Sequence, residues 1–285
     1  MRSGIGEGVV HMYMKLKNGH SKVFTLSYDD GVKQDIRLVD ILNKHGLKGT
    51  FNINTGLYAP EEHDRTRDEW RMKLSESQQV YGNSGHEVAV HGLTHPFLER
   101  INTPDVLREI LEDRRNIESQ YGTLARGMAY PFGTYNQEVV DCLEKCGICY
   151  ARTVQSTHTF AFPDNWLTLH PTCHHNDNRL MELADRFVHT SPNFQDNWLF
   201  YVWGHSFEFD THNNWNVIEE FAEYIGNRED VWYATNIEIY DYVKAYKSLQ
   251  TNVDETMVYN PTATHVWFAK DGKTYCIKSG ERLLL

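Results

Sequence analysis

The sequence has few basic residues: 28 Lys and Arg stand against 39 Asp and Glu, which gives a formal net charge of −11. Nucleic acids and anionic membranes are bound through basic patches, so we expect neither as a partner. The N-terminal stretch also lacks an apolar run long enough for a signal peptide or a membrane span. We therefore expect a cytoplasmic protein, with a leader removed ahead of this sequence as the alternative.

Regularly paired cysteines are missing as well. The five cysteines are an odd number, which argues against a disulfide framework. Cys142, Cys146 and Cys149 are spaced C-x3-C-x2-C, but no fourth thiol lies near them in the sequence. We interpret this stretch as a helix that ends near Gly147 and leads into a strand, rather than as a zinc or iron–sulfur site.

Low-complexity tracts and repeats of fixed period are absent too, and short β-rich runs alternate with helical patterns instead. With 285 residues, 40% of them hydrophobic, the chain can bury one large core. The alternation predicts an α/β barrel over residues 1–250. The predicted strands are 23–28, 49–53, 87–90, 127–130, 148–152, 166–169, 198–203 and 231–235. The predicted helices are 35–46, 103–122, with Thr103 as its N-cap, and 213–230.

From residue 251 the pattern changes to two alternating apolar runs on either side of Asp271–Gly272. An Asp-Gly pair between such runs is typical of a β-hairpin. We expect residues 251–285 to form a small β appendage without catalytic chemistry.

Polar residues directly follow several of the predicted strands. In a parallel barrel the carboxyl ends of the strands share one mouth, where substrate sites lie, so we expect these side chains to gather there. The residues at these positions are Asp29, Asp30, Asn54, His91, His95, His205 and Asn236.

Asp29 and Asp30 would repel each other at the end of a buried strand unless a cation offsets their charges. His91 and His95 are four residues apart, a spacing that on a helical turn puts both imidazoles on one face, within reach of one ion. The pattern predicts a metal site, with an ordinary Asp-Gly turn as the alternative for the two carboxylates. A second set with the same histidine spacing is the alternative metal site, and it comprises His170, Cys173, His174 and His175.

Four stretches resemble, in order, the motifs of the polysaccharide deacetylase family, which is carbohydrate esterase family 4 or the NodB-homology domain. SYDDG (27–31) resembles T-F-D-D-G, and HGLTH (91–95) resembles H-[ST]-x-x-H. AYPFG (129–133) resembles R-x-P-Y-G, and YVWGH (201–205) resembles L-x-H. The resemblance spans about residues 20–245 and implies a distorted (β/α)7 barrel.

The resemblance also implies roles for the residues of the first, second and last motifs. Asp29 matches the catalytic base, and His205 matches the general acid that protonates the leaving amine. Asp30, His91 and His95 match the ligands of one divalent ion. We expect this ion to be Zn²⁺, with Co²⁺ or Ni²⁺ as alternatives.

The third motif lines the substrate groove in the family and supplies a backbone N–H to the oxyanion. The resemblance thus implies that Tyr130, Pro131 and Phe132 contact the substrate. We add Asn54, which follows the second predicted strand, with capping of a loop as its alternative role. Trp203 falls inside a predicted strand, and we expect it to belong to the core.

Three departures from the family pattern stand out. Gly92 replaces a hydroxyl residue that braces the metal loop in the family. Ala129 replaces the arginine that tethers the base, and Arg126 and Arg152 are the nearest candidates for that role. The fourth motif, D-x-x-D-W, which tunes the acid, has only a loose counterpart in PDNW (163–166).

The activity implied is metal-dependent hydrolysis of an N-acetyl amide on a sugar or oligosaccharide, with release of acetate. One alternative is a metal-dependent hydrolase of a small cytosolic amide or ureide. The other is an inactive deacetylase-like module that binds sugar.

Overall fold

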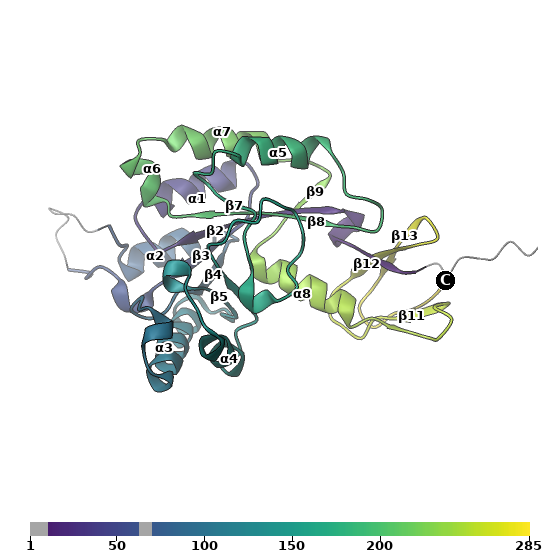
Figure 1. Cartoon of the computed structure of the whole chain (residues 1–285), viewed down its shortest axis with the longest axis horizontal. Helices are drawn as coiled ribbons and strands as arrows, with labels where there is room; N and C mark the ends of the chain where they lie inside the picture. The colour runs from purple at the N-terminus through teal and green to yellow at the C-terminus, as the bar shows by residue number, and fades with distance from the viewer. Residues whose placement is uncertain (1–10, 63–69) are drawn as a thin grey trace, which may run out of the picture.

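The computed structural model describes residues 11–62 and 70–285, in which strands and helices alternate along most of the chain (Figure 1). The strands are β1 (Tyr13–Lys15), β2 (Lys22–Asp29), β3 (Gly49–Ile53), β4 (Glu87–Val90), β5 (Gly127–Ala129), β6 (Tyr150–Arg152), β7 (Cys173–His174), β8 (Trp198–Gly204), β9 (Val231–Tyr233), β10 (Gln250–Thr251), β11 (Met257–Tyr259), β12 (Val266–Lys270), β13 (Lys273–Ile277) and β14 (Arg282–Leu284). The helices are α1 (Asp35–Lys44), α2 (Leu74–Tyr81), α3 (Thr103–Tyr121), α4 (Gln137–Lys145), α5 (Leu180–His189), α6 (Phe207–Thr211), α7 (Trp215–Ile225) and α8 (Asn236–Lys247). Among the helices of these described ranges, none combines the length and the apolar character needed to cross a membrane.

The central sheet is parallel and curls into the distorted (β/α)7 barrel that was predicted. Its strands follow the order β6-β5-β4-β3-β2-β8-β7, and β9 pairs with the first half of β2. Residues 169–174 close the ring, because Leu169 pairs with Arg152 of β6 while Cys173 and His174 pair with β8. All the carboxyl ends of these strands therefore face one mouth.

Strand β2 runs through the middle of this sheet and is buried along its whole length. Its side chains alternate between two environments, as the two-residue period of a strand requires. Phe24 packs on Phe200 of β8 and Phe221 of α7, outside the barrel. Thr25 points into the barrel, where its hydroxyl donates to the Asn236 side chain. Asp29 continues the inward series at the end of the strand.

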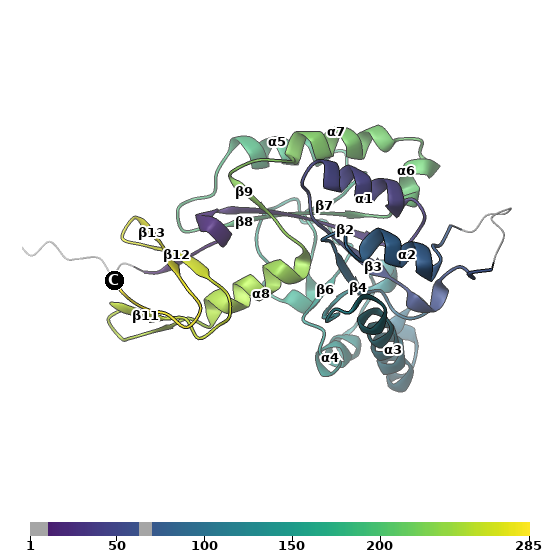
Figure 2. The same cartoon turned by 180° about the vertical axis from the view of Figure 1, so that it is seen from behind.

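Helices cover the outside of the sheet. α1, α5, α6 and α7 lie along one side, α3 and α4 lie along the other, and α2 lies between them next to α1 (Figures 1 and 2). α3 begins one residue earlier than expected, because the Asn102 side chain, not Thr103, accepts the N–H of Asp105 as N-cap. It ends, as predicted, at Gly122, whose φ of 64° is left-handed.

One predicted strand is wrong. Residues 166–168 form a turn of 3-10 helix, because the Asn165 side chain accepts the N–H of Leu167 and starts a helical turn. Only Leu169 of that segment pairs with the sheet, and the strand itself comes later, at Cys173–His174. A two-residue strand is too short to leave a periodic pattern in the sequence.

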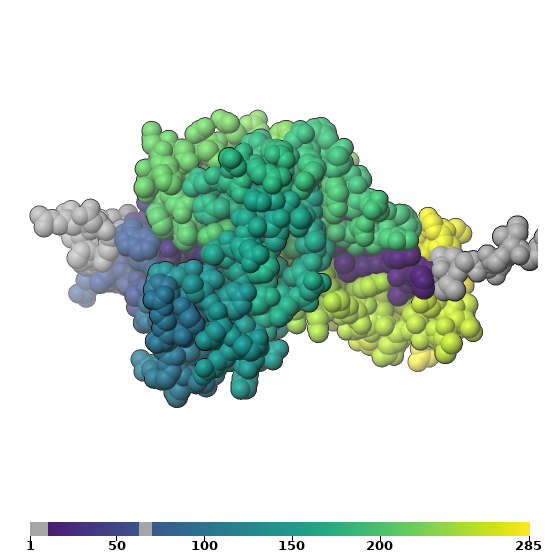
Figure 3. Space-filling view, viewed as in Figure 1, coloured from purple at the N-terminus to yellow at the C-terminus, as the bar shows by residue number. Residues whose placement is uncertain are grey.

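The C-terminal residues form two small antiparallel sheets at one end of the molecule, with strand orders β1-β12-β13 and β10-β11-β14. β12 and β13 pair across Asp271–Gly272, so this turn joins two hydrogen-bonded strands. The N-terminal strand β1 adds to the same sheet, and in Figure 3 the purple N-terminal segment lies beside the yellow C-terminal residues. The appendage is therefore built from both ends of the described chain.

Candidate active site

A cavity of about 290 Å³ opens at the mouth of the barrel. Most of the predicted site residues line it, whereas Pro131 and Asn54 do not. The lining residues are Asp29, Asp30, His91, His95, Tyr130, Phe132, Gly133, Val154, Trp203 and His205.

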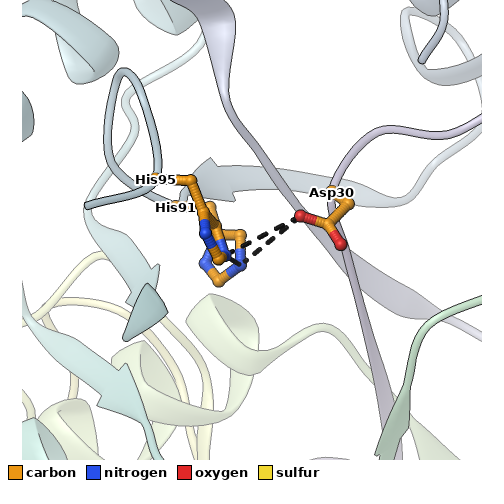
Figure 4. Close-up of side chains that lie close together, drawn as sticks. All are labelled: Asp30, His91 and His95. Carbon is orange, nitrogen blue, oxygen red and sulfur yellow. Dashed lines mark hydrogen bonds and ion pairs between the residues drawn. The ribbon is translucent and has the colours of Figure 1, made fainter. Parts of the chain in front are cut away.

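Asp29 and Asp30 are adjacent in sequence but face different partners. Asp29 ends β2 on its inward face, opposite Asn52 of β3. Asp30 lies just beyond the strand with a φ of 84°, a left-handed conformation that is costly for an aspartate. This turn of the backbone sends its carboxylate toward the histidines of the next loop (Figure 4). Backbone strain of this kind is concentrated at functional sites.

Asp30, His91 and His95 form a group that can hold a metal ion, since one ligand atom from each lies within 4.8 Å of the others. The Oδ1 atom of Asp30 is 4.0 Å from Nε2 of His91 and 3.8 Å from Nε2 of His95, and the two Nε2 atoms are 3.2 Å apart (Figure 4). Two imidazoles and one carboxylate are a donor set suited to zinc.

The protonation of the histidines also fits a cation. The Nδ1 atom of His91 lies 2.9 Å from the Ala129 carbonyl oxygen, to which it can only donate, so the lone pair of the neutral ring is on Nε2. Burial lowers the pKa of His91 and, with the nearby His91 ring, lowers the pKa of His95 to about 4. Both rings are therefore neutral near pH 7, as metal ligation requires.

The loop that carries the two histidines is not the helical turn that the spacing suggested. Gly92 and His95 both have positive φ, at 78° and 57°, and residues 91–95 form a tight loop. Thr94 is the hydroxyl residue that braces it, because its Oγ1 and its N–H each donate to Glu109 of α3 at 2.7 Å. The brace expected at position 92 thus comes from two residues farther along the chain.

Asn54 supports this loop instead of contacting a substrate, which corrects the prediction. It is 2% exposed, and its Nδ2 donates to the backbone oxygens of His91 and Gly92, both at 2.7 Å. Its Oδ1 accepts from Arg71 at 2.8 Å. Arg71 also donates to Oδ1 of Asp30 at 3.1 Å, so one guanidinium joins this loop to the Asp30 carboxylate.

Asp29 has a donor on each carboxylate oxygen. Asn52 donates to Oδ1 at 2.9 Å, and Arg152 donates to Oδ2. Arg152 is completely buried and its guanidinium stacks on the Trp203 ring, 4.4 Å from the ring centroid. Burial by itself raises the pKa of Asp29, but the charge of Arg152, with His91 and His205, outweighs it and holds that pKa well below its ordinary value.

His205 follows β8 and reaches the same carboxylate from the other side of the cavity. Its Nε2 is 3.9 Å from Oδ2 of Asp29, and its Nδ1 is 2.9 Å from Oε1 of Glu208 in α6. Burial lowers the pKa of His205, but the hydrogen bond to Glu208 and the charges of Asp29 and Asp30 outweigh it and raise that pKa. A protonated imidazole facing the cavity can act as a general acid.

Aromatic rings form the rest of the cavity. Phe132 is 49% exposed and stacks on Phe97, with ring centroids 3.7 Å apart. Tyr130 is buried and its hydroxyl donates to the Leu167 carbonyl, so that hydroxyl is already engaged. Trp203 is only 8% exposed, in line with a core residue, yet it also lines the cavity.

The alternative metal set does not assemble as a unit. His170 pairs through Nδ1 with the Thr153 hydroxyl, and Cys173 is buried in β7. Burial raises the pKa of the Cys173 thiol to about 12, so the free thiol is protonated near pH 7. Only His174 and His175 come together, beside Glu208.

Comparison with known proteins agrees with this geometry. Residues 16–151 match the family model described as "Polysaccharide deacetylase". Over just under half of its length, the chain is thus similar to the polysaccharide deacetylase family. A chitooligosaccharide deacetylase from Bradyrhizobium sp. (strain ANU 289) is 30% identical over 144 residues, 50% of this chain and 57% of the relative. A peptidoglycan-N-acetylglucosamine deacetylase from Listeria monocytogenes is 27% identical over 130 residues, 42% of this chain and 24% of the relative.

The aligned parts thus cover less than two thirds of either relative. A crystal structure assigned as a polysaccharide deacetylase from Mycobacterium smegmatis has a TM-score of 0.57 at 17% identity, over 82% of this chain and 94% of that chain. This likeness supports the fold that the strand order gives.

The arginine that binds Asp29 lies one strand away from the position that the third motif of the resembling family specifies. Ala129 of β5 and Arg152 of β6 are cross-strand partners, so the two positions lie side by side in the sheet. Arg152 was one of two candidates in the sequence. Arg126, the other, lies before β5, where it pairs with Asp241 of α8. The register of the short strands β5 and β6 decides between the two arginines, and this register cannot be read from the sequence.

Asn52, Arg71 and Glu208 were missed altogether. Asn52 carried a weak signal, since it lies two residues before Asn54 on the same face of a strand that leads to the mouth. Glu208 lies three residues after His205, a spacing that suits contact across one helical turn. No comparable signal marks Arg71, whose contact depends on how its loop crosses the mouth.

Proposed function

We propose that this protein is a metal-dependent deacetylase that hydrolyses the N-acetyl amide of a sugar or oligosaccharide and releases acetate. The observation that carries the proposal is the convergence on one cavity of a tethered carboxylate, a raised-pKa histidine and a three-residue metal-binding group. The names of the aligned relatives, which include a chitooligosaccharide deacetylase and a peptidoglycan-N-acetylglucosamine deacetylase, point to the same class of substrate.

Asp30, His91 and His95 are the residues that would hold the ion, for which zinc suits the donor set best. When bound, such an ion lowers the pKa of a coordinated water and polarises the acyl carbonyl.

The side chains of the cavity divide the proton transfers between them. Asp29 accepts a proton from the attacking water as the carbon–oxygen bond forms, with Arg152 and Asn52 holding its carboxylate in place. The backbone N–H of Phe132, or of a close neighbour, donates to the oxyanion of the tetrahedral intermediate. Nε2 of His205 then gives its proton to the amine nitrogen as the carbon–nitrogen bond breaks. The products are acetate and the free amine.

The size of the cavity, about 290 Å³, is at the lower end for a ligand site and suits one acetylated sugar unit at a time. The exposed Phe132 ring at its edge offers an apolar face to that sugar. Longer chains would extend beyond the cavity across the open mouth.

The test is acetate release from N-acetylglucosamine, its oligomers and small N-acetylated amines, with metal-stripped and metal-restored protein. We expect release from at least one sugar, loss on stripping, and recovery with Zn²⁺, Co²⁺ or Ni²⁺. Asp29→Asn should reduce the rate by at least about a thousandfold, whereas Asp40→Asn, an exposed aspartate on α1, should not change it. Turnover of the small amines alone would favour an amidase, and no turnover with metal restored would favour a binding module.

A further inference from the structure

Glu208 is surrounded by nitrogen donors on both of its oxygens. Oε1 lies 2.9 Å from Nδ1 of His205. Oε2 lies 3.0 Å from Nε2 of His175, 3.3 Å from Nε2 of His174 and 3.0 Å from Nδ2 of Asn176. One carboxylate thus joins the proposed general acid to two further histidines that the proposed reaction does not use.

His174, His175 and Glu208 have the geometry of a metal-binding group, since their ligand atoms lie within 4.8 Å of one another. The hydrogen bonds of His174 argue against that use. The backbone N–H of Asn176 donates to Nδ1 of His174 at 3.1 Å, so the proton of the neutral ring must be on Nε2, facing Glu208. A metal on Nε2 would need the proton on Nδ1, where another N–H already points.

His91 has the opposite arrangement. Its Nδ1 donates to a backbone carbonyl, which leaves the lone pair on Nε2 for a metal. The two histidine groups therefore differ in tautomer, although both have ligand-like spacing. The group at Asp30 can offer a lone pair to a cation, whereas the group at Glu208 places two imidazole nitrogens at 3.0 and 3.3 Å from a carboxylate oxygen.

The His175 side chain beside Glu208 is closely packed. The His175 ring is fully buried between Tyr28 and Phe209, stacked on them at centroid distances of 5.6 and 4.2 Å. Gly204 makes room for it, because a Cβ at position 204 would fall 2.0 Å from Nδ1 of His175. Gly204 is thus required by the position of His175, which in turn lies against Glu208.

We propose, resting on the deacetylase function above, that Glu208 is a positioning residue for His205 and that His174, His175 and Asn176 hold Glu208 in place. Through Oε1, Glu208 fixes the proton of His205 on Nδ1 and aims Nε2 at the cavity and at Asp29. Its negative charge favours the imidazolium, which is the form that donates a proton to the leaving amine. After the transfer, His205 remains hydrogen-bonded to Glu208 through Nδ1–H, so it is re-protonated on Nε2 without turning.

The pKa shifts in the cluster agree with a charged Glu208 and a neutral His174 beside it. Burial raises the pKa of Glu208, but hydrogen bonds from His175 and His205 outweigh it and hold that pKa well below its ordinary value. Burial, with the neighbouring His175, lowers the pKa of His174 to about 4, so His174 is a neutral donor. The charged and titratable groups that face His205 are Glu208 of α6, Asp29 and Asp30 at the end of β2, and His174 and His175 beside β7.

The test is an NMR titration of the histidine rings in the whole protein, which needs no turnover. In Glu208→Gln, we expect the midpoint of His205 to fall by about one pH unit or more relative to the unmodified protein. Glu182→Gln, which removes an exposed carboxylate of α5, is the matched control and should leave the midpoint unchanged. An unchanged His205 midpoint in folded Glu208→Gln would overturn the proposal. Where acetate release is measurable, the alkaline limb of kcat/KM should move down with the midpoint.

A second measurement uses the unmodified protein and does not depend on the folding of any variant. Ring ¹⁵N shifts should report a proton on Nε2 in His174 and on Nδ1 in His91. Addition of Zn²⁺ should perturb His91 and His95 and leave the His174 and His175 resonances unchanged. The reverse tautomer in His174, or a second equivalent of Zn²⁺ bound there, would overturn the proposal. Absence of acetate release with both results intact would reject only the deacetylase function.

Discussion

Two arginine–aspartate pairs lie at opposite ends of the same two strands. Arg152, the last residue of β6, binds Asp29 at the mouth, and Arg126, just before β5, binds Asp241 at the far end. The side chains of the first pair are 1% and 3% exposed, and those of the second are 30% and 45% exposed. The chemistry of the two pairs is identical, so their surroundings must account for any difference in what they do.

Water makes that difference. An exposed pair loses little when it forms, because each charge is solvated with or without its partner, and its contribution is about 0–1 kcal/mol. A buried pair depends on both members, because removal of one leaves the other charge in a medium that cannot solvate it. The buried pair at the mouth cannot break without a large cost, and this keeps the Asp29 carboxylate ionised and in one orientation.

The largest effect is expected for Arg152→Met. The substitution leaves Asp29 buried without its cation, so we expect a loss of about 3–5 kcal/mol in the free energy of unfolding. The displaced base should also reduce kcat/KM by about a hundredfold. Urea unfolding and acetate release measure the two effects. A loss below about 1 kcal/mol would mean that the pair behaves like one on the surface.

Asn52→Ala should have a smaller effect at the same carboxylate. It removes the neutral donor to Oδ1 of Asp29, which is worth about 1 kcal/mol of unfolding free energy, while the Arg152 pair remains. We expect kcat to fall by about tenfold with little change in KM, because the base and not the substrate loses a contact. Asn216→Ala, at an exposed position of α7, is the control. A change in KM alone would place Asn52 in substrate binding.

Thr94→Val extends the comparison to threonine–glutamate pairs. Thr94 and Glu109 brace the loop that carries His91 and His95, whereas Thr103 and Glu138 form a similar contact on the surface. Loss of the first contact should weaken metal affinity by about 10- to 100-fold, because the loop positions both histidine ligands. Thr103→Val should leave affinity unchanged. Competition with a chromogenic chelator measures both, and equal effects would show that burial does not matter here.

The sequence predicted the fold well where elements are long and periodic. The runs that became β2, β3, β4 and β8 were located to within a residue or two, because β-rich apolar runs bounded by polar loops are a strong signal. β7 and β1 were missed, since two or three residues show no period. β1 also pairs with β12, which lies far along the chain, and no local pattern can reveal such a pairing.

The site divides in the same way. Asp29, Asp30, His91, His95 and His205 were predicted because each follows a predicted strand in a short motif, and in the structure all five line one cavity. Arg152, Asn52 and Glu208 act on those residues from a neighbouring strand or helix. Their contacts depend on register and on where a loop turns, and these are properties of the assembled sheet. Asn54 is the opposite case. Its place after a predicted strand suggested that it lines the cavity, but in the structure its side chain donates to the backbone oxygens of His91 and Gly92.

Arg126→Met is the smallest predicted effect and the sharpest control. It removes a guanidinium that makes two hydrogen bonds to Asp241, at 3.0 and 2.6 Å, so the pair is bidentate. Because both side chains are partly exposed, we expect a loss of about 1 kcal/mol or less, reduced further in high salt, and an unchanged rate of acetate release. Unfolding midpoints at low and high NaCl measure this directly. If Arg126→Met costs as much as Arg152→Met, hydrogen-bond geometry and not burial sets the strength of both pairs, and the low pKa assigned to Asp29 would need another cause.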